Sequence, residues 1–375
     1  MTPAGIAIAN QSAQGLLRGP RAVLEQAIEQ RAFPGAAWGV LHSGEVTALD
    51  SVGRFTWDPA SPAVSTATVF DLASVTKVLA TTAGAMLLVD RGLLDLDARL
   101  GDILPGFVIG MAPGSGKQRV TLRMLLAHNS GMVGWAPLFR NCSTPDALLS
   151  AILRLPLEAQ PGARTEYSDF GFILLGKVIE LLTGTPLDVF CAREIFAPLG
   201  LAHTRFRPRP ADRAAIPPTE DDRTFRGRVL QGEVQDEHAF VLGGVAGHAG
   251  VFSNVEDLLH FAQCILHRGR TADGNQLFRP ETVDLFCARQ TTPDGQSRAL
   301  GWDVPTEASS SGRFFGQRSI GHLGYAGTSL WIDRDQGLAV ALLTNRTWPD
   351  RSNEAIRQIR PAFHDAVVES LRARA

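Results

Sequence analysis

The chain has 375 residues, of which 45% are hydrophobic and 20% are charged. This composition is typical of a globular protein with an ample core, and it excludes a disordered or fibrous chain. The formal net charge of −2 gives no indication of a general polyanion-binding surface, so we expect no nucleic-acid partner.

Cysteine and hydropathy patterns exclude further classes of protein. The four cysteines form no C-x-x-C pair, so neither a metal knuckle nor a redox motif is predicted, and we expect buried free thiols. The most apolar stretch, 78–89, is shorter than the roughly 18 to 20 residues that a membrane span needs. The N-terminus lacks the basic start and the long apolar run of a secretory signal. We therefore expect no membrane span and a cytoplasmic location.

The N-terminal part of the chain predicts a helix followed by a hairpin. Apolar residues recur at helical spacing over 20–32. Two strands are expected at 36–41 and 46–52, joined by the turn residues Ser43 and Gly44.

Helical patterns and loops rich in Pro and Gly dominate the middle of the chain. Long helices are expected at 74–91, 171–182 and 254–268. The last of them begins with Ser253 and Glu256, which match a capping box. Residues 205–228 are rich in Pro and Arg and show no periodicity, so we expect an irregular surface loop there.

The C-terminal part returns to strand patterns before a last helix. The strands are expected at 313–320, 328–333 and 338–344, and the helix at 353–372. Strands at both chain ends with helices between them predict an α+β fold, with an antiparallel sheet flanked by helices, built from both chain ends, and an inserted all-helical domain. We place the sheet domain at 20–95 plus 290–375, and the helical domain with its cleft-bordering loops at 96–289.

Several common catalytic and phosphate-binding signatures are absent from the sequence. Residues 114–117 (Gly-Ser-Gly-Lys) lack the flanking residues of a P-loop, and no G-x-G-x-x-G, G-x-S-x-G or H-E-x-x-H occurs. His260 and His267 are seven positions apart on one predicted helix, which favours solvent or core positions over metal ligation. We therefore predict no metal ion and no organic cofactor.

Ser74 and Lys77 lie three positions apart at the start of the predicted helix 74–91. This spacing puts both side chains on one face, within reach of a hydrogen bond. A lysine whose ammonium form is disfavoured can remove the serine proton, and a helix N-terminus stabilises the negative charge that develops. The alternative is an ordinary helix that happens to contain both residues. Because the chain has only three lysines, the pair favours a functional role.

A second motif, Tyr167-Ser168-Asp169, comes just before the predicted helix 171–182. A phenol in such a turn can share a proton with Lys77 and pass it to a leaving group. Taken alone, a tyrosine that anchors a helix start is the better interpretation.

A third motif, His322-Leu323-Gly324-Tyr325, leads into a strand. Small residues there let a substrate lie along the backbone, and a main-chain amide can complete an oxyanion hole. Taken alone, a hairpin turn is the better interpretation. Both tyrosines of the chain nevertheless fall within these motifs.

Together and in this order, the three motifs resemble those of one family. The chain is similar to the penicillin-recognising serine hydrolases, in the class C β-lactamase-like branch of D-alanyl-D-alanine carboxypeptidases, esterases and amidases. Residues 74–77 resemble its S-x-x-K motif, 167–169 its Y-x-N motif and 322–324 its H-x-G motif. The stretches 125–131 and 244–253 add to the resemblance, which covers roughly residues 20–370.

The resemblance implies a role for each site residue. Ser74 is the expected nucleophile, and Lys77 and Tyr167 share the general-base and general-acid work. The backbone amides of Ser74 and Tyr325 are the expected oxyanion hole. The other residues expected to contact substrate are His322, Gly324 and Asp169.

Two positions depart from the family pattern. Asp169 stands where the pattern has Asn, and an anion near Lys77 favours the ammonium form and weakens it as a base. Either Asp169 points away, or it is neutralised, or Tyr167 carries more of the base role. His322 replaces a lysine that helps to hold the substrate carboxylate in β-lactamases, so we expect weak or no β-lactamase activity.

Two other features have alternative interpretations. Residues 236–248 are dense in Gly and His, and they either border the cleft through Asp236, His238 or His248 or form a tight structural turn. Trp302 is expected in the core rather than in the cleft.

We therefore expect a serine hydrolase that forms an acyl-enzyme on Ser74. Its expected substrate is a small ester, amide or peptide, with cell-wall-derived compounds among the candidates. Asp169 supports a second hypothesis, a catalytically impaired member that binds cell-wall fragments or a partner. A third hypothesis is a transesterase, which passes the same acyl group to an alcohol. No oligomeric state is predicted.

Overall fold

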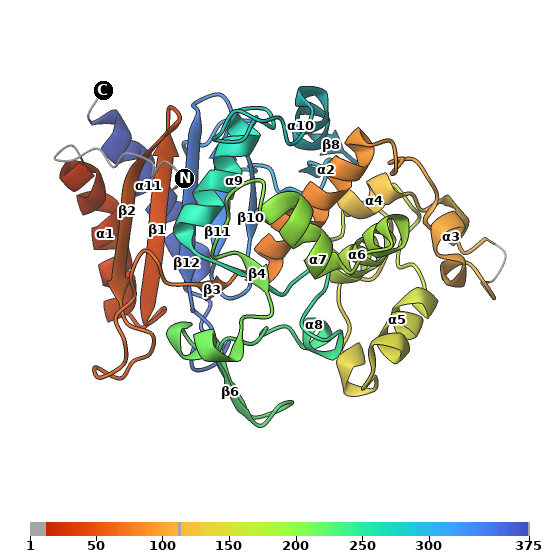
Figure 1. Cartoon of the computed structure of the whole chain (residues 1–375), viewed down its shortest axis with the longest axis horizontal. Coiled ribbons are helices and arrows are strands. Elements are labelled where there is room, and N and C mark those ends of the chain that lie inside the picture. Colours follow the sequence, from red (N-terminus) through yellow and green to blue (C-terminus); the bar gives the residue numbers. More distant parts are fainter. Residues whose placement is uncertain (1–12, 112–113, 374–375) are drawn as a thin grey trace.

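A computed structural model describes residues 13–111 and 114–373 of the chain. Its largest sheet, among these residues, is antiparallel with the strand order β10-β11-β12-β1-β2 (Figure 1). The strands are Gly35–His42 (β1), Glu45–Gly53 (β2), Ile320–Leu323 (β10), Ser329–Asp333 (β11) and Leu338–Thr344 (β12). The N-terminal hairpin and the C-terminal strands thus form one sheet, and the prediction of a sheet built from both ends is confirmed.

The hairpin turn and the pairing of the two chain ends follow from the sequence. Ser43 and Gly44 both have positive φ, 53° and 85°, which is the backbone of the two-residue turn that the sequence predicted. Strand β1 pairs with β12 from Ala36 opposite Thr344 to His42 opposite Leu338. Every residue of β12 is buried, because the sheet is covered on both faces.

Helices cover the two faces of the sheet. Helices α1 (Ala13–Glu29) and α11 (Ile356–Arg372) pack on one face, where Trp38 and Phe363 meet edge to face with their ring centroids 5.5 Å apart. Helix α9 (Val255–Leu266) contacts β1 and β12 from the other side (Figure 1).

A second helical region extends away from the sheet beyond α9 (Figure 1). Its helices are α2 (Ala83–Asp90), α3 (Leu100–Ile103), α4 (Leu122–Leu126), α5 (Pro145–Arg154), α6 (Asp169–Thr183), α7 (Leu187–Cys191), α8 (Glu237–Val241) and α10 (Pro280–Cys287). One continuous apolar cluster joins this region to the sheet face under α9. Helix α9 therefore packs on the sheet although it lies inside the segment 96–289, whose boundaries stay a prediction.

The segment that carries Ser74 changes its helical form along its length. It begins as a 3₁₀ turn at Ala73–Val75, continues as a π-helix at Lys77–Thr82 and ends as α2. Every residue of the π-helical part is buried. The sequence predicted a helix from 74 to 91. The structure has a 3₁₀ turn and π turns before α2, and π turns are frequent at functional sites.

Short strands stand where the sequence predicted a loop over 205–228. They are β4 (Arg205–Phe206), β5 (Glu220–Asp222) and β6 (Arg228–Leu230). Strand β4 pairs with β7 (Val251–Ser253), which also pairs with β3 (Phe70–Asp71). The loop prediction is wrong for these strands. The ladder partner of β4 lies far away in the sequence, and β5 and β6 form a ladder of only three residues with each other. The remaining short pair is β8 (Gln290–Thr291) and β9 (Ser297–Arg298).

Two further sequence predictions are wrong for local reasons. The N-cap of α9 is Asn254, whose side chain accepts from the Asp257 amide, because Ser253 is the last residue of β7. Residues 313–319 are not a strand, since two of their backbone amides donate to side-chain carboxylates instead of to a neighbouring strand. Asp365 accepts from the Arg313 amide and Asp333 from the Gly316 amide, both at 2.7 Å.

Two expectations about composition can also be compared with the structure. The cysteines are free and buried, as predicted. Among the described residues, Ala73–Asp90 has the length and hydropathy of a membrane span, and the bent pair formed by α6 and Leu187–Phe196 passes the same test. Because 83% of the first stretch is buried inside the protein, a core helix explains its hydropathy.

Candidate active site

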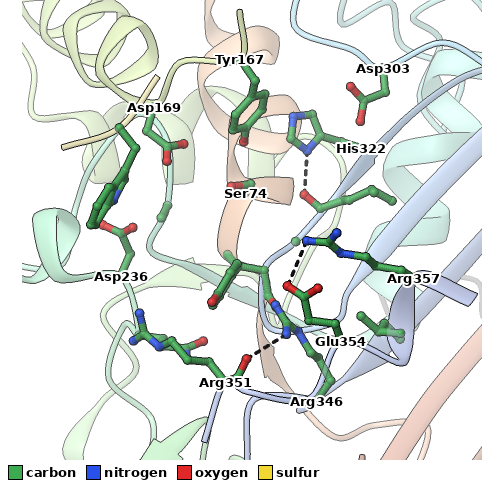
Figure 2. A pocket seen from close by; sticks show the side chains of 18 of the residues that line it. Ser74, Tyr167, Asp169, Asp236, Asp303, His322, Arg346, Arg351, Glu354 and Arg357 are labelled. Atoms are coloured by element: carbon green, nitrogen blue, oxygen red, sulfur yellow. Dashed lines mark hydrogen bonds and ion pairs between the residues drawn. The ribbon is translucent and has the colours of Figure 1, made fainter. Parts of the chain in front are cut away.

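Ser74 opens into a cavity of about 680 Å³ between the sheet and the helical region (Figure 2). The residues of all three sequence motifs line this cavity, namely Ser74, Tyr167, Asp169, His322, Gly324 and Tyr325. Lys77 lies beneath the surface and reaches Ser74 from below the cavity floor. The structure therefore brings together every site residue that the sequence predicted.

The turn before Ser74 is strained and firmly held. Ala73 has a φ of +46°, a left-handed conformation that costs a non-glycine residue on the order of 1–3 kcal/mol. The buried carboxyl of Asp71 accepts from the amides of Ala73 and Gln235, both at 2.8 Å. Burial raises the pKa of Asp71 to about 6. The amide of Leu72 donates to the Val251 carbonyl, so β7 and Asp71 fix the backbone that presents Ser74.

Lys77 is fully buried and its ammonium group has three acceptors. Its Nζ lies 3.0 Å from Ser74 Oγ, 2.7 Å from Asp169 Oδ1 and 3.2 Å from the carbonyl oxygen of His248. The Tyr167 ring lies under the same nitrogen, with its centroid 4.8 Å away. Asp169 thus points at Lys77, and the alternative that it points away is wrong.

The charge on Lys77 follows from these neighbours. Burial lowers the pKa of Lys77, but Asp169 and Tyr167 together outweigh burial and hold it above its ordinary value. A buried ammonium is stable only when it is paired, and the Asp169 contact supplies that pair. Lys77 is therefore a cation in the resting site.

Tyr167 directs its hydroxyl toward Ser74 (Figure 2). The residue is 37% exposed at its outer edge, while desolvation raises the pKa of its phenol against the opposing charge of Lys77. The ring stacks on His128 with centroids 4.6 Å apart, and the Arg298 guanidinium lies 5.4 Å from the ring centroid on the cavity side. The ring is thus fixed while the hydroxyl remains free to exchange a proton.

His128 is a positioning residue that the sequence analysis did not name. Its Nδ1 accepts from the Ser168 amide at 3.0 Å, and its ring lies between those of Tyr167 and Phe172. Burial holds the pKa of His128 well below its ordinary value, so the ring is neutral. Its place in the family-like stretch 125–131 was the available signal.

The turn between β10 and β11 is locked against the nucleophile segment. Thr328 Oγ1 donates to the Leu72 carbonyl at 2.9 Å, and the Gly324 amide donates to the Thr328 carbonyl at 2.8 Å. A Cβ atom on Gly324 would lie 1.9 Å from Thr328 Oγ1 and 2.4 Å from the Leu72 oxygen. Glycine is required here because two backbone segments approach each other this closely.

His322 is neutral in this environment. The side chain is buried, its Nδ1 donates to the Leu323 carbonyl at 2.9 Å, and burial lowers its pKa to about 4. A neutral imidazole attracts a carboxylate less strongly than an ammonium does. The structure thus gives His322 the uncharged state on which the β-lactamase expectation rests.

An arginine-rich surface, formed by Arg346, Arg351, Arg357 and Arg360, lines the cavity beside Tyr325 (Figure 2). Arg346 donates to the Tyr325 carbonyl at 2.7 Å and lies 4.4 Å from the centroid of its ring. The sequence analysis missed these residues, because single arginines in the segment 346–360 form no motif.

The segment 236–248 borders the site, as one of its two interpretations proposed. Asp236 lines the cavity, and its Oδ1 lies 2.8 Å from His248 Nε2. The backbone carbonyl of His248 accepts a hydrogen bond from Lys77. Trp302 lies fully buried in the core, stacked near Phe261, as predicted.

Comparisons with known proteins agree with this geometry. Residues 20–362 match the family model described as Beta-lactamase. The chain is 35% identical over 350 residues to an N-acetylmuramyl-L-alanine amidase of Bacillus subtilis (strain 168), which covers 84% of this chain and 77% of that protein. The chain belongs to the beta-lactamase family.

Other members and neighbours of the beta-lactamase family extend the comparison. A protein of Escherichia coli (strain K12) with the provisional name D-alanyl-D-alanine carboxypeptidase is 36% identical over 307 residues, 75% of this chain and 70% of that protein. The structure of EstCE1, described as a hydrolase with promiscuous acyltransferase activity, has a TM-score of 0.76 at 22% identity and covers 95% of this chain and 99% of its own.

A penicillin-binding protein homologue from Pyrococcus abyssi, described as octameric, has a TM-score of 0.73 at 19% identity over 94% of this chain and 77% of its own. At such identities the structural neighbours show a shared fold. The predicted family, the α+β fold class and the serine hydrolase class are confirmed.

Proposed function

We propose that this beta-lactamase family member is an amidase that cleaves the amide of N-acetylmuramyl-L-alanine through an acyl-enzyme on Ser74. The observation that carries the proposal is the 3.0 Å contact between Lys77 Nζ and Ser74 Oγ at the floor of the cavity. The choice of amide rests on the amidase of Bacillus subtilis that is 35% identical to the chain.

The proton path uses Tyr167 and Lys77 together. Asp169 keeps Lys77 charged, and the Tyr167 phenol is neutral at rest. The Lys77–Tyr167 pair therefore becomes a base when it loses one proton. Ser74 Oγ then attacks the carbonyl carbon, and its proton passes to the Lys77–Tyr167 pair. The same proton moves to the amine nitrogen, the amine leaves, and water later cleaves the ester on Ser74.

The amides of Ser74 and Tyr325 are the proposed oxyanion hole, and Arg360 supports the second of them. Arg360 is buried and donates to the carbonyl oxygens of Gly324 and Thr328 at 2.7 and 2.8 Å. The Gly324 carbonyl and the Tyr325 N–H belong to one planar trans peptide, so they point in opposite directions. A charged donor on the carbonyl therefore fixes the N–H and makes it a stronger donor to the oxyanion.

The cavity carries charges of both signs, which suits a polar substrate with a free carboxylate. Its acidic residues are Asp169, Asp236, Glu237, Asp303 and Glu354, and its basic ones are Arg298 and the four arginines of the arginine-rich surface. Arg351 is engaged by Glu220 and Glu237. Arg357, at the exposed rim, is available to the alanine carboxylate of the substrate because its partner Glu354 is also exposed.

The test is L-alanine release from N-acetylmuramyl-L-alanine by the wild type and by Ser74→Ala. We expect the variant to lose at least about 10³-fold in kcat while its circular dichroism is unchanged. Equal release by the two proteins would contradict the proposal and favour the binding hypothesis. Faster turnover of a D-alanyl-D-alanine peptide or of p-nitrophenyl butyrate would contradict the choice of amide.

Two further assays test the β-lactamase expectation and the transesterase hypothesis. Nitrocefin is expected to be turned over weakly or not at all, because His322 is neutral, and turnover equal to that of the best substrate would contradict this. An added alcohol that captures most of the acyl group would favour the transesterase hypothesis.

A further inference from the structure

Three side chains of the segment 236–248 converge beside the cavity. Asp236 stands at the N-terminus of α8, His238 in its first turn and His248 before β7. One possible ligand atom of each lies within 4.8 Å of the others. Both histidines are buried, and Asp236 reaches the cavity that contains Ser74.

His238 differs from the other buried histidines in its hydrogen bonding. Within the described part of the chain, neither nitrogen of His238 has a hydrogen-bond partner, and neither does Nδ1 of His248. By contrast, the buried His128, His248, His322 and His364 each use one ring nitrogen in a hydrogen bond. Buried polar atoms without a partner are costly, and His238 has two of them close to the side chain of Asp236, which indicates a site for a ligand.

His238 is held in place by packing rather than by hydrogen bonds. The rings of Trp135, Phe139 and Phe170 meet it nearly edge to face, with centroids 6.2, 5.3 and 5.4 Å away. A fixed, neutral imidazole with a free lone pair is the form in which histidine binds a metal ion.

Asp236 supplies the charge that a cation requires. Its Oδ1 accepts from the Ala239 amide and contacts His248 Nε2, both at 2.8 Å. That contact has to open to admit an ion, and the Nε2 proton can move to the unpartnered Nδ1 of the same ring.

We propose that Asp236, His238 and His248 bind a zinc ion at the edge of the substrate cavity. Two imidazoles and one carboxylate are ligands that zinc prefers, and three protein ligands leave a fourth position for water or substrate. The ion is adjacent to the catalytic group, since the His248 carbonyl accepts from Lys77. The sequence analysis predicted no metal ion because it found no metal-ligand motif. The three residues of this cluster match no such motif, since α8 and the loop that follows it bring them together.

The test is zinc binding by the untagged full chain, measured by equilibrium dialysis and metal analysis. We expect about one zinc ion per chain. His238→Phe preserves a ring within the aromatic packing and is expected to lose the ion, and Asp236→Asn is expected to weaken binding at least about tenfold. The matched control is His267→Ala, which removes an exposed histidine outside the cluster and is expected to bind like the wild type.

Further readouts make the result independent of the proposed amidase activity. Ser74→Ala is expected to bind zinc like the wild type, and cobalt in place of zinc is expected to give the visible absorption of a four-coordinate site. Thermal melting confirms that each variant is folded. A wild type without bound zinc, or a folded His238→Phe variant that binds zinc like the wild type, would overturn the proposal.

Discussion

The two walls of the cavity are built from different kinds of interaction. On the helical side, Ser74, Lys77 and Asp169 form a chain of side-chain contacts at 3.0 and 2.7 Å. On the sheet side, Arg346 and Arg360 donate to backbone carbonyls of the β10–β11 turn. The helical wall can transfer protons because its neighbouring side chains can exchange protons with one another. The second can hold a fixed dipole because guanidinium groups stay charged.

Tyr167→Phe gives the largest effect that separates the two walls. The substitution removes the hydroxyl that faces Ser74 but keeps the ring stacked on His128. We expect kcat to fall by about 10²–10⁴-fold with little change in KM, because proton transfer is lost and the arginine-rich surface is intact. Steady-state kinetics on the amide substrate measures this. A fall in kcat of less than fivefold would assign the proton path to Lys77 alone.

Arg360→Gln tests the sheet wall. Its loss removes the charged donor from the Gly324 carbonyl, so the Tyr325 amide loses orientation and polarity. We expect a fall in kcat of about 10²-fold, near that for loss of an oxyanion donor, with an unchanged pH profile. The matched control is Arg357→Gln at the exposed rim, which is expected to change KM a few-fold and leave kcat intact.

Two outcomes would count against this role of Arg360. An equal effect of the two arginine variants would show that Arg360 contributes only charge. Full rescue of kcat by Arg360→Lys, which keeps a cation but loses the planar fork, would likewise show that the geometry of the guanidinium contributes nothing.

Asp169→Asn is expected to move the pH profile rather than to abolish activity. Without the carboxylate, only Tyr167 opposes the lowering of the Lys77 pKa by burial, so the neutral form of Lys77 appears at lower pH. The alkaline rise in kcat/KM should therefore shift by about one to three pH units toward acid. His322 has a pKa of about 4 and adds no titration above pH 5. If kcat/KM of the variant rises at the same pH as that of the wild type, Asp169 does not set the charge of Lys77.

Ala73→Gly gives the smallest expected effect. Glycine adopts the φ of +46° without the cost that Ala73 bears, so the free energy of unfolding should rise by about 1 kcal/mol. Urea denaturation measures the difference. A destabilised variant would show that the Ala73 methyl packing outweighs the backbone strain.

The helical wall and the β10–β11 turn were predictable from sequence, and the arginines that donate to that turn were not. Ser74 and Lys77 stand at a helical spacing that brings their side chains together, and Tyr167 stands in a motif that resembles one of the family. The direction of Asp169 stayed open because it depends on how α6 packs against the segment 73–82, which no local pattern records. Arg360 could not be found, since a helical arginine is usually exposed and this one is buried by tertiary contact.

The same distinction holds for the fold. The hairpin at 43–44 and the strand at 338–344 were predictable because turn residues and apolar runs are local signals. The strand expected at 313–320 was wrong because Asp333 and Asp365 take its amides. The short strands within 205–228 were missed because a ladder of two or three residues has no periodicity of its own.

The most direct test of the central claim is irreversible labelling with a fluorophosphonate, which reacts with an activated serine and is not released. We predict one adduct per chain on the peptide that contains Ser74, formed in step with the loss of amidase activity. The Ser74→Ala variant should remain unlabelled. Activity that persists after labelling is complete, or inactivation with no adduct on Ser74, would contradict the account.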